Sequence, residues 1–448
     1  MRTISKVFVG FVLVMTGIWL VSNPDLFAAS SFISLRHFMV QYSGFLAISM
    51  MSLILLLSVR PVWLTRRLGG LDKAYRLHKW LGIAVLIVAT LHWAWRMAPK
   101  WGVALGLLER GRRGSRPGGP DGAGLHWAQS LFNEQRGLAE TVGEWAFYIA
   151  VALILIALIK RIPYRWFART HTVLAVIYLV LVYHSIVLLD FANWATPVGY
   201  VLAAMLMVGT VSSIIVLFGL IGAGRRSSGE VIDVDYLPEM KSLQIAIRSD
   251  GGWKGHLAGQ FAFVRFGNSN EAHPFTIASA WRDGVPGLTI IAKKLGDYTS
   301  TLYETLKPGD RVALEGPYGT FVLDREKRHQ IWISGGIGLT PFVAWLEDLV
   351  ANPTKLEIDF YQVAPHCDPE LMTRINDLAG RAGVRLHEWR DARDGFLTGE
   401  KVRSDVAHWQ EAQVWFCGPR QFGEDVKNDL VAAGLHSYAF HQELFDFR

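Results

Sequence analysis

Six apolar stretches fill the first half of this 448-residue chain, and they constrain its fold more than any other feature. They cover residues 5–22, 38–58, 75–97, 142–160, 171–190 and 197–221. Most approach the roughly 20 apolar residues that a helix needs to cross the hydrocarbon core of a bilayer. The hydrophobic content of 51% and the mean hydropathy of +0.24 are high for a soluble protein. The sequence therefore predicts an α-helical membrane bundle with six spans.

The first stretch allows two interpretations. A basic start at residues 1–6, an apolar run and small residues at 28–30 are typical of a cleaved signal peptide. An uncleaved span instead gives an even number of helices and returns the chain to the side on which it began. We expect an uncleaved anchor.

Lysine and arginine in the short loops predict the orientation of the bundle. One side of the membrane collects basic residues around 60–79, 160–169 and 225–226, whereas those on the other side concentrate in the long loop 98–141. The balance places the N-terminus and the C-terminal half in the cytosol. Because the net charge of +6 lies mostly at these membrane flanks, it gives no support for nucleic-acid binding.

Two of the predicted spans each carry two histidines. His78 and His92 are 14 residues apart, and His171 and His184 are 13 apart. An ionisable side chain inside a bilayer is costly and is usually functional, and imidazole is an axial ligand of haem iron. At ~1.5 Å per residue, either spacing separates two levels by roughly 20 Å. The pattern predicts two haems clamped between two helices. The alternative is a set of helix-end or hydrogen-bonded core histidines.

The helical angles suit the first span better than the second. At about 100° per residue, His92 returns to within ~40° of the face of His78. On an ideal helix His184 lies roughly 140° away from His171. Either the second helix twists locally, or its two imidazoles reach the cofactors from different flanks.

After residue 222 the pattern changes to short strands. Segments 230–235, 243–248, 260–266, 287–292 and 311–315 follow one another without helices and predict an antiparallel β-barrel. Segments 330–334, 356–363, 385–389 and 413–417 alternate with helical stretches and predict an α/β domain with a parallel sheet. We expect three domains, at 1–222, 229–325 and 326–448, with a flexible linker at 222–229.

A glycine-rich turn follows the first parallel strand. Gly335, Gly336 and Gly338 precede Thr340 and Pro341, which suit the cap and the first turn of a helix. Glycines let the backbone approach a pyrophosphate, and a helix N-terminus offers free N–H donors. Since the spacing is not G-x-G-x-x-G, an ordinary capped turn is the alternative.

Two segments of the predicted barrel suit a flavin nucleotide. Residues 273–279, with the sequence HPFTIAS, place an aromatic ring and hydroxyl groups directly after a strand. Residues 296–299, with the sequence GDYT, offer backbone and hydroxyl donors to a second pyrophosphate. Both segments could equally be ordinary barrel turns. Only two cysteines, Cys367 and Cys417, are present, so neither a disulfide framework nor a cysteine-based metal site is available.

The order of these motifs resembles the ferric reductase and NADPH oxidase superfamily over nearly the whole chain, especially its compact bacterial NADPH oxidases. The resemblance implies a ferredoxin-reductase-like module that binds FAD in the barrel and NADPH or NADH in the α/β domain. It also implies two haems of the b type. His78 and His171 would hold the haem on the cytosolic side, and His92 and His184 the haem on the outer side.

The resemblance also assigns roles in nucleotide binding. The residues implied in FAD binding are His273, Pro274, Phe275, Thr276, Ser279, Gly296 and Thr299, with Phe275 and Thr276 beside the isoalloxazine and Ser279 near the flavin phosphates or ribityl chain. Those implied in NAD(P)H binding are Gly335, Gly336, Gly338, Thr340, Pro341, Gly418 and Pro419. Cys417 would lie at the hydride-transfer site, and Phe445 would stack on the flavin, with Phe447 as a stand-in.

The nicotinamide preference rests on one arginine. Related chains that prefer NADPH often carry a Ser or Arg after the second nucleotide strand, but residues 362–366 here contain no Arg. Arg393 is the candidate replacement, so we expect NADPH over NADH. No EF-hand loop and no proline-rich tail is present, so neither calcium nor organiser proteins are indicated as regulators.

We therefore expect a multi-pass enzyme of a bacterial-type inner membrane, in contact with membrane lipid, that passes electrons from cytosolic NAD(P)H through FAD and two haems to a small-molecule acceptor outside. Dioxygen, giving superoxide, is the expected acceptor, because Trp101, Trp127 and 103–108 could pack the long loop as a lid. Arg96, with Arg36 or His37, could attract superoxide. A ferric chelate and a periplasmic partner reductase are the alternative acceptors. A histidine-lined metal transporter is less suitable, because transport needs neither nucleotide loop.

Overall fold

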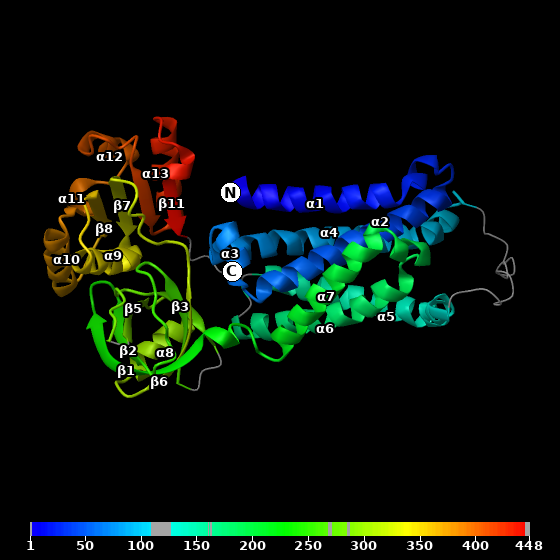
Figure 1. Cartoon of the computed structure of the whole chain (residues 1–448), viewed down its shortest axis with the longest axis horizontal. Coiled ribbons are helices and arrows are strands. Elements are labelled where there is room, and N and C mark those ends of the chain that lie inside the picture. Colours follow the sequence, from blue (N-terminus) through cyan, green and yellow to red (C-terminus); the bar gives the residue numbers. More distant parts are fainter. Residues whose placement is uncertain are drawn as a thin grey trace. The chain divides into compact units, whose positions relative to one another are not determined.

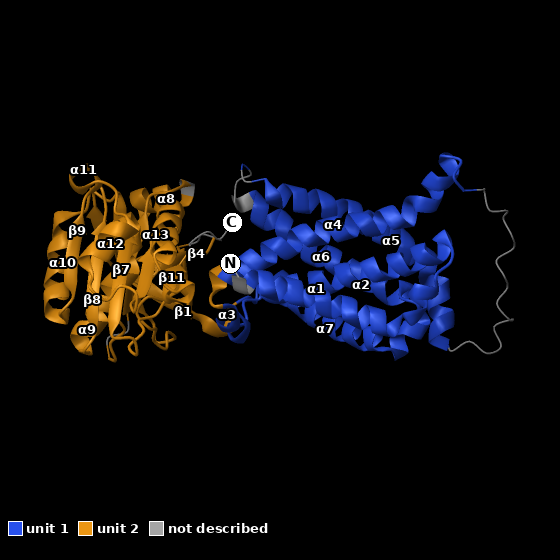
Figure 2. Ribbon diagram, turned by 90° about the horizontal axis from the view of Figure 1, so that it is seen from above, with its two compact units in different colours: residues 1–68, 73–221, 448 blue, residues 69–72, 222–447 orange. Residues whose placement is uncertain are grey.

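The computed structural model describes residues 2–108, 127–159, 161, 164–267, 271–284 and 287–443. The chain divides into two compact units, coloured separately in Figure 2. Unit 1 comprises residues 1–68, 73–221 and 448, and unit 2 comprises residues 69–72 and 222–447.

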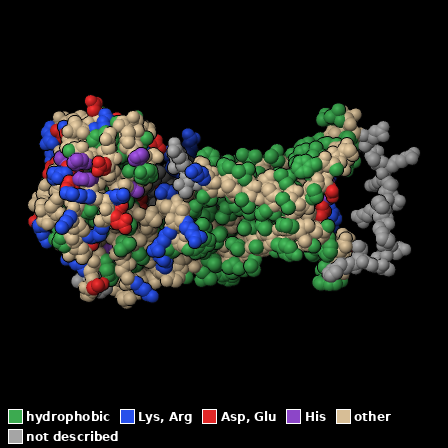
Figure 3. Space-filling view, turned by 45° about the horizontal axis from the view of Figure 1, so that its top comes forward, with side chains coloured by type: hydrophobic (Ala, Val, Ile, Leu, Met, Phe, Trp, Pro, Cys, Tyr) green, Lys and Arg blue, Asp and Glu red, His purple; other side chains and the backbone are tan. Residues whose placement is uncertain are grey.

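Within its described residues, unit 1 holds six helices that are long and apolar enough to cross a membrane. They are α1 (Arg2–Ser22), α2 (Phe32–Ser58), α4 (Leu71–Ala104), α5 (Trp127–Leu158), α6 (Tyr164–Leu188) and α7 (Pro197–Leu217), labelled in Figure 1. A short helix, α3 (Val62–Leu68), lies between α2 and α4. The face of the bundle seen in Figure 3 is mostly hydrophobic, as contact with lipid requires. The six predicted spans are confirmed as apolar helices.

The six helices are not evenly packed. Helix α5 runs close to α6, and α2 runs close to α7, but the backbone of α4 stays farther from every other described helix. Small residues allow the close approaches. Helix α7 also packs against α6, where a Cβ on Gly209 would lie 2.0 Å from the hydroxyl of Tyr178. The wider spacing around α4 leaves room beside the two histidines that this helix carries.

Unit 2 begins with an antiparallel sheet that closes into a barrel. Its strands are β1 (Arg226–Leu237), β2 (Ser242–Ser249), β3 (Phe261–Phe266), β4 (His273–Thr276), β5 (Gly287–Lys293) and β6 (Arg311–Tyr318), in the order β4-β3-β6-β1-β2-β5. Pairing of Ile277 with Ile290 joins the two edges. The five predicted strands are confirmed. β4 was not predicted, and β1 starts inside the expected linker.

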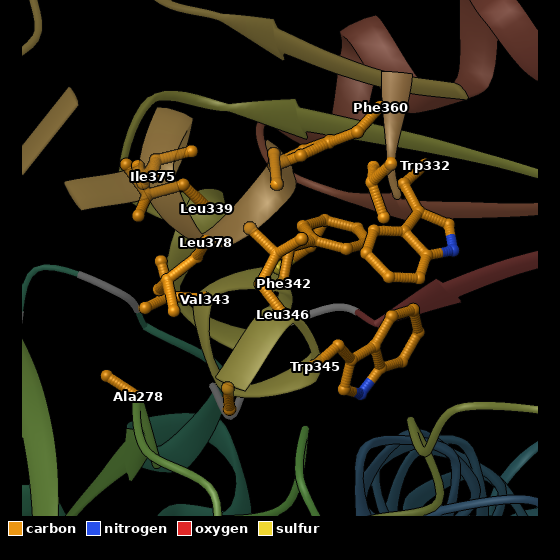
Figure 4. Close-up of a cluster of buried hydrophobic side chains, with 14 of the residues drawn as sticks. Ala278, Trp332, Leu339, Phe342, Val343, Trp345, Leu346, Phe360, Ile375 and Leu378 are labelled. Atoms are coloured by element: carbon orange, nitrogen blue, oxygen red, sulfur yellow. The ribbon is translucent and has the colours of Figure 1, made fainter. Parts of the chain in front are cut away.

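The rest of unit 2 is a parallel sheet covered on both faces. Its strands are β7 (His329–Gly335), β8 (Glu357–Val363), β9 (Arg385–Trp389), β10 (Gln413–Cys417) and β11 (Phe440–Glu443), in the order β11-β10-β7-β8-β9. Helices α9 (Thr340–Ala351) and α10 (Pro369–Ala382) share a core with one face, and α12 (Gly399–Asp405) and α13 (Arg420–Ala432) with the other. Figure 4 shows Trp332, Phe342 and Trp345 in the first core. The four predicted strands are confirmed; β11 was not predicted.

The barrel and the parallel sheet share buried contacts. The indole Nε1 of Trp345 donates to the carbonyl oxygen of Ala258 at 2.9 Å. A carboxylate oxygen of Glu347 accepts from the backbone N–H of Ala280 at 3.0 Å. Because these contacts are buried, unit 2 packs as one body, and the predicted boundary at 325–326 falls in the connection between β6 and β7.

Candidate functional site

The four histidines of unit 1 form two pairs, as the sequence predicted. The ring centres of His78 and His171 are 5.8 Å apart, and those of His92 and His184 are 6.4 Å apart. An imidazole nitrogen binds a metal at about 2 Å, and its ring centre lies about 1 Å farther, so two imidazoles on opposite sides of one metal have centres about 6 Å apart. Both pairs have the separation that a shared metal requires.

Backbone carbonyl groups orient three of the four rings. Each accepts from the Nδ1 of one histidine: Ile54 from His78 at 3.2 Å, Val40 from His92 at 3.0 Å, and Ala139 from His184 at 2.8 Å. Since a carbonyl oxygen only accepts, Nδ1 carries the proton in each ring and Nε2 keeps the lone pair that binds metal. The fourth ring differs, because the buried Nδ1 of His171 has no hydrogen-bond partner among the described residues.

Two glycines make room for the pair formed by His92 and His184. A Cβ on Gly143 of α5 would lie 1.9 Å from Nδ1 of His184. A Cβ on Gly44 of α2 would lie 3.2 Å from Cε1 of His92. Position 143 therefore excludes any side chain as long as His184 keeps its place. At position 44 a side chain would fit only if His92 moved by a few tenths of an ångström.

A cavity surrounds this pair. It holds about 860 Å³ of empty space, including the part open to the surroundings, and is lined by α2, α4, α5 and α6. Most of the lining is apolar, apart from the two imidazoles, Ser185 and the charged side chains of Arg96, Glu140 and Glu144. The apolar walls and the paired imidazoles suit a flat, hydrophobic macrocycle such as that of haem.

His171 and His184 are 13 residues apart on α6, and different neighbours contact their rings. Helix α6 is uninterrupted from Tyr164 to Leu188, so no local break turns the second imidazole. The ring of His171 stacks on Phe167 with centres 5.1 Å apart, whereas His184 is held by Ala139 of α5. The two imidazoles are therefore held by different neighbours, and the choice between the two expected arrangements stays a prediction.

Sequence reasoning missed two glutamates beside the pair formed by His92 and His184. Arg96 donates from Nη1 to Glu144 at 2.9 Å and from Nη2 to Glu140 at 3.3 Å, and all three side chains line the cavity. The signal was present, because two carboxylates four residues apart share one face of α5 just before its long apolar run.

The other two groups expected to attract superoxide are engaged elsewhere. The guanidinium of Arg36 donates to the carbonyl oxygens of Trp95 and Arg96 at 3.1 and 3.3 Å. The imidazole Nε2 of His37 lies 2.6 Å from a carboxylate oxygen of Asp190. These contacts join α2 to α4 and to the segment that follows α6.

The two segments predicted to bind FAD touch each other. The ring of His273, at the start of β4, stacks on Tyr298 of α8 (Asp297–Thr305) with centres 3.9 Å apart. Burial lowers the pKa of His273, so the ring is neutral at pH 7. The hydroxyl of Thr299 accepts from the backbone N–H groups of Leu295 and Gly296 at 2.9 and 3.2 Å. The hydroxyl of Thr299 also donates to the carbonyl oxygen of Gly296 at 3.2 Å, so a pyrophosphate here would depend on the other backbone N–H groups at the N-terminus of α8.

Two residues of the flavin motif are buried. Phe275 is 8% exposed and packs in the barrel core, and Thr276 is also 8% exposed. Side chains alternate along a strand, so Pro274 and Thr276 lie on the face of β4 opposite to Phe275. The contacts of Phe275 and Thr276 with the isoalloxazine stay predictions. The hydroxyl of Ser279 accepts from the backbone N–H of Thr289 at 2.9 Å.

The two loops predicted to bind NAD(P)H lie side by side at the carboxyl edge of the parallel sheet. A Cβ on Gly335 would lie 2.6 Å from Pro419, and one on Gly418 would lie 2.8 Å from the backbone nitrogen of Gly335. A Cβ on Gly338 would lie 2.0 Å from the carbonyl oxygen of Cys417. The glycines therefore allow the two backbones to touch, and Gly336 takes a left-handed φ of +55° in the same turn.

The start of helix α9 differs from the expectation in one respect. Thr340 is its first residue and not its cap, and its hydroxyl donates to the carbonyl oxygen of Ile337 at 2.8 Å. A short 3-10 helix over Gly336–Leu339 precedes it, which moves the helix start by one residue. Pro341 lies in the first turn, as expected.

Cys417 ends strand β10 and is 1% exposed. Burial, with the neighbouring carboxylate of Glu443, raises the pKa of its thiol well above the ordinary value. The thiol is therefore protonated at neutral pH, and it can pack against a bound ring but not act as a nucleophile.

The remaining predictions concern Arg393, two phenylalanines near the C-terminus and the loop predicted as a lid. Arg393, in the short helix α11 (Asp391–Asp394), forms two hydrogen bonds of 2.8 Å with Asp394, which raise its pKa. A 2′-phosphate would have to compete with that carboxylate. Phe445 and Phe447 lie outside the described residues, as do residues 109–126 of the predicted lid. The described lid residues do not pack as expected, because Trp101 is 45% exposed, Trp127 is 73% exposed and Leu105 and Leu107 are 73% and 76% exposed.

Comparison with known proteins identifies two regions. Residues 43–182 match the family described as the ferric reductase like transmembrane component, and residues 228–322 match an FAD-binding domain. The electron transfer component of toluate 1,2-dioxygenase from Pseudomonas putida is 27% identical over 42% of this chain and 58% of its own length. A flavohemoprotein of Bordetella pertussis is 28% identical over 46% of this chain and 57% of its own length. The chain spans about half the length of the curated relatives it matches.

Among solved structures, the FAD/NAD-binding domain of nitric oxide dioxygenase from Vibrio cholerae is similar, at 19% identity and a TM-score of 0.43, over 48% of this chain and 97% of that one. The ferredoxin reductase in carbazole 1,9a-dioxygenase is similar over 49% of this chain and 69% of that one, at 19% identity and a TM-score of 0.41.

Proposed function

Because this chain belongs to the ferric reductase and NADPH oxidase superfamily, we propose that it carries electrons across a membrane from cytosolic NAD(P)H to dioxygen on the outer side, forming superoxide. It is an oxidoreductase that joins a ferric-reductase-like transmembrane domain to an FAD-binding reductase module. The N-terminus and the reductase module face the cytosol in this proposal, as the basic loops predict, and the membrane is a bacterial-type inner membrane.

The histidine pairs carry the proposal. Two pairs with the spacing of a shared metal lie between the same two membrane helices, and three of the four rings are oriented by carbonyl groups. His78 and His171 would hold one b-type haem, and His92 and His184 the other. When bound, FAD splits the electron pair of a hydride into single electrons, and the two haems carry them across the hydrocarbon core.

The side chains of unit 2 would bind and align the nucleotides. The adjoining turns at Gly335 and Gly418 offer backbone to the nicotinamide dinucleotide, with Cys417 packed beneath them as a neutral thiol. The segments around Thr276 and Gly296 would hold FAD. The chemistry needs no acid–base residue from the protein, because the cofactors carry the electrons and the protein fixes their positions.

The outer cavity supports dioxygen over an anionic ferric chelate. Its lining pairs Arg96 with the carboxylates of Glu140 and Glu144, so the lining itself offers an anionic chelate no net positive charge to bind. Dioxygen is neutral and small, and it needs no docking surface. A ferric chelate or a periplasmic partner reductase is the alternative acceptor.

The test compares two acceptors in purified, FAD-supplemented enzyme. NADPH-driven superoxide formation, followed with a probe sensitive to superoxide dismutase, should exceed the reduction of a ferric chelate measured without oxygen. Undiminished chelate reduction together with negligible superoxide would make the chain a ferric reductase. Activity only after addition of a co-purified periplasmic protein would favour the partner reductase.

A further inference from the structure

Arg96 on α4 and Glu140 and Glu144 on α5 form an ion triad next to the pair of His92 and His184. Arg96 is one helical turn beyond His92 on α4. Glu140 directly follows Ala139, whose carbonyl oxygen accepts from His184. Residues 139–144 of α5 therefore orient His184, a candidate metal ligand on α6, and also carry the two carboxylates.

The triad is held in a fixed arrangement. Glu144 receives Nη1 of Arg96 at 2.9 Å and the hydroxyl of Tyr148 at 2.9 Å. Glu140 receives Nη2 of Arg96 at 3.3 Å, and its other oxygen lies 3.2 Å from Nε of Arg136. The side chain of Arg136 is 57% exposed and does not line the cavity. Each carboxylate thus has two partners that keep its charge next to the cavity.

Charges at such a place act on any redox group in the cavity. Reduction of the group adds one negative charge, which a carboxylate disfavours and a guanidinium favours, and apolar walls weaken the interaction less than water does. Among the described residues that line the cavity, Arg96 is the one cation and Glu140 and Glu144 are the carboxylates. The two carboxylates of the lining therefore favour the oxidised state, and Arg96, with Arg136 and Arg36 beside Glu140, offsets part of this effect.

We propose that this triad sets the reduction potential of the haem held by His92 and His184, keeping it low enough to reduce dioxygen. The proposal rests on the proposed function. In the step concerned, one electron leaves the ferrous iron, which becomes ferric, and dioxygen gains that electron to become superoxide; no proton moves. Arg96, Glu140 and Glu144 are positioning and tuning residues, because none of them needs to bind the iron.

Variants of opposite sign test the proposal in the full-length, FAD- and haem-loaded enzyme. Glu144→Gln and Glu140→Gln should each shift the midpoint potential of the outer haem upward in a spectroelectrochemical titration. Arg96→Gln should shift it downward, and Arg96→Lys, which keeps the charge, should stay close to the parent. Arg136→Gln is the matched control, since it removes a charge from the same ion cluster outside the cavity and should shift the potential less.

His92→Ala identifies which redox wave belongs to the outer haem, because that wave should disappear. An outer wave that stays at the parent potential in all three neutral variants would overturn the proposal, and so would shifts of the same sign for Arg96→Gln and Glu144→Gln. A parent enzyme without any haem wave would instead refute the proposed function, and this inference with it. Haem content is measured in each variant, so a potential is compared only between enzymes that hold both haems.

Discussion

Replacing Gly143 by alanine should empty the proposed haem site of His92 and His184 and leave the proposed site of His78 and His171 intact. A Cβ at this position would lie 1.9 Å from Nδ1 of His184, whereas real Cβ atoms keep at least 3.0 Å from other atoms. The ring would have to move by about 1.1 Å, the difference between these two distances. Ligand distances in metal sites hold to within about 0.2 Å, so the iron cannot keep this ligand.

The expected loss in haem affinity is at least on the order of 10- to 100-fold, the range seen when support for a metal ligand is removed. Overpacking adds a cost of about 1–3 kcal/mol to folding. Haem per polypeptide, measured as the pyridine haemochrome, should fall from two towards one. Gly137→Ala on the same helix is the matched control, because its Cβ would meet nothing within 4 Å, and it should keep both haems. A Gly143→Ala enzyme with two haems would refute the assigned role of His184.

Four further predictions concern single residues. His92→Ala should remove one of the two haems by the same haemochrome assay, and an unchanged ratio would exclude it as a ligand. Arg393→Ala should raise KM for NADPH more than for NADH, and Asp394→Asn should lower KM for NADPH, since it frees the arginine; equal effects on both donors would make Arg393 a surface charge. Phe445→Ala should change FAD affinity and strengthen nicotinamide binding, measured by flavin fluorescence and steady-state kinetics, and no change in either would exclude it from the flavin. Because burial raises the pKa of Cys417, its thiol stays protonated where an ordinary cysteine titrates, so stopped-flow FAD reduction should show no thiol ionisation between about pH 6 and pH 9.

The sequence predicted those parts of the structure whose signals are local. Apolar length alone places the membrane helices, and alternating apolar residues place most strands. The prediction of four histidines in two pairs needed only their spacing and the rise of a helix. The angle between His171 and His184 could not be resolved that way, because it depends on which neighbouring helix holds each ring.

The missed features depend on contacts between distant segments. Strand β4 contains Pro274 and β11 has four residues, so neither stands out until a neighbouring strand pairs with it. Gly143 is one of several glycines in apolar helices, and only the position of His184 shows why a side chain is excluded there. The inward direction of Phe275 likewise follows from its register against β3.

The most direct test of the whole account is the absorbance of purified, FAD-loaded enzyme after NADPH is added without oxygen. The account predicts that the bands of two b-type haems shift from the ferric to the ferrous form, and that admitting air restores the ferric spectrum as superoxide forms. A preparation without haem bands, or with haem that NADPH and FAD leave oxidised, would contradict it.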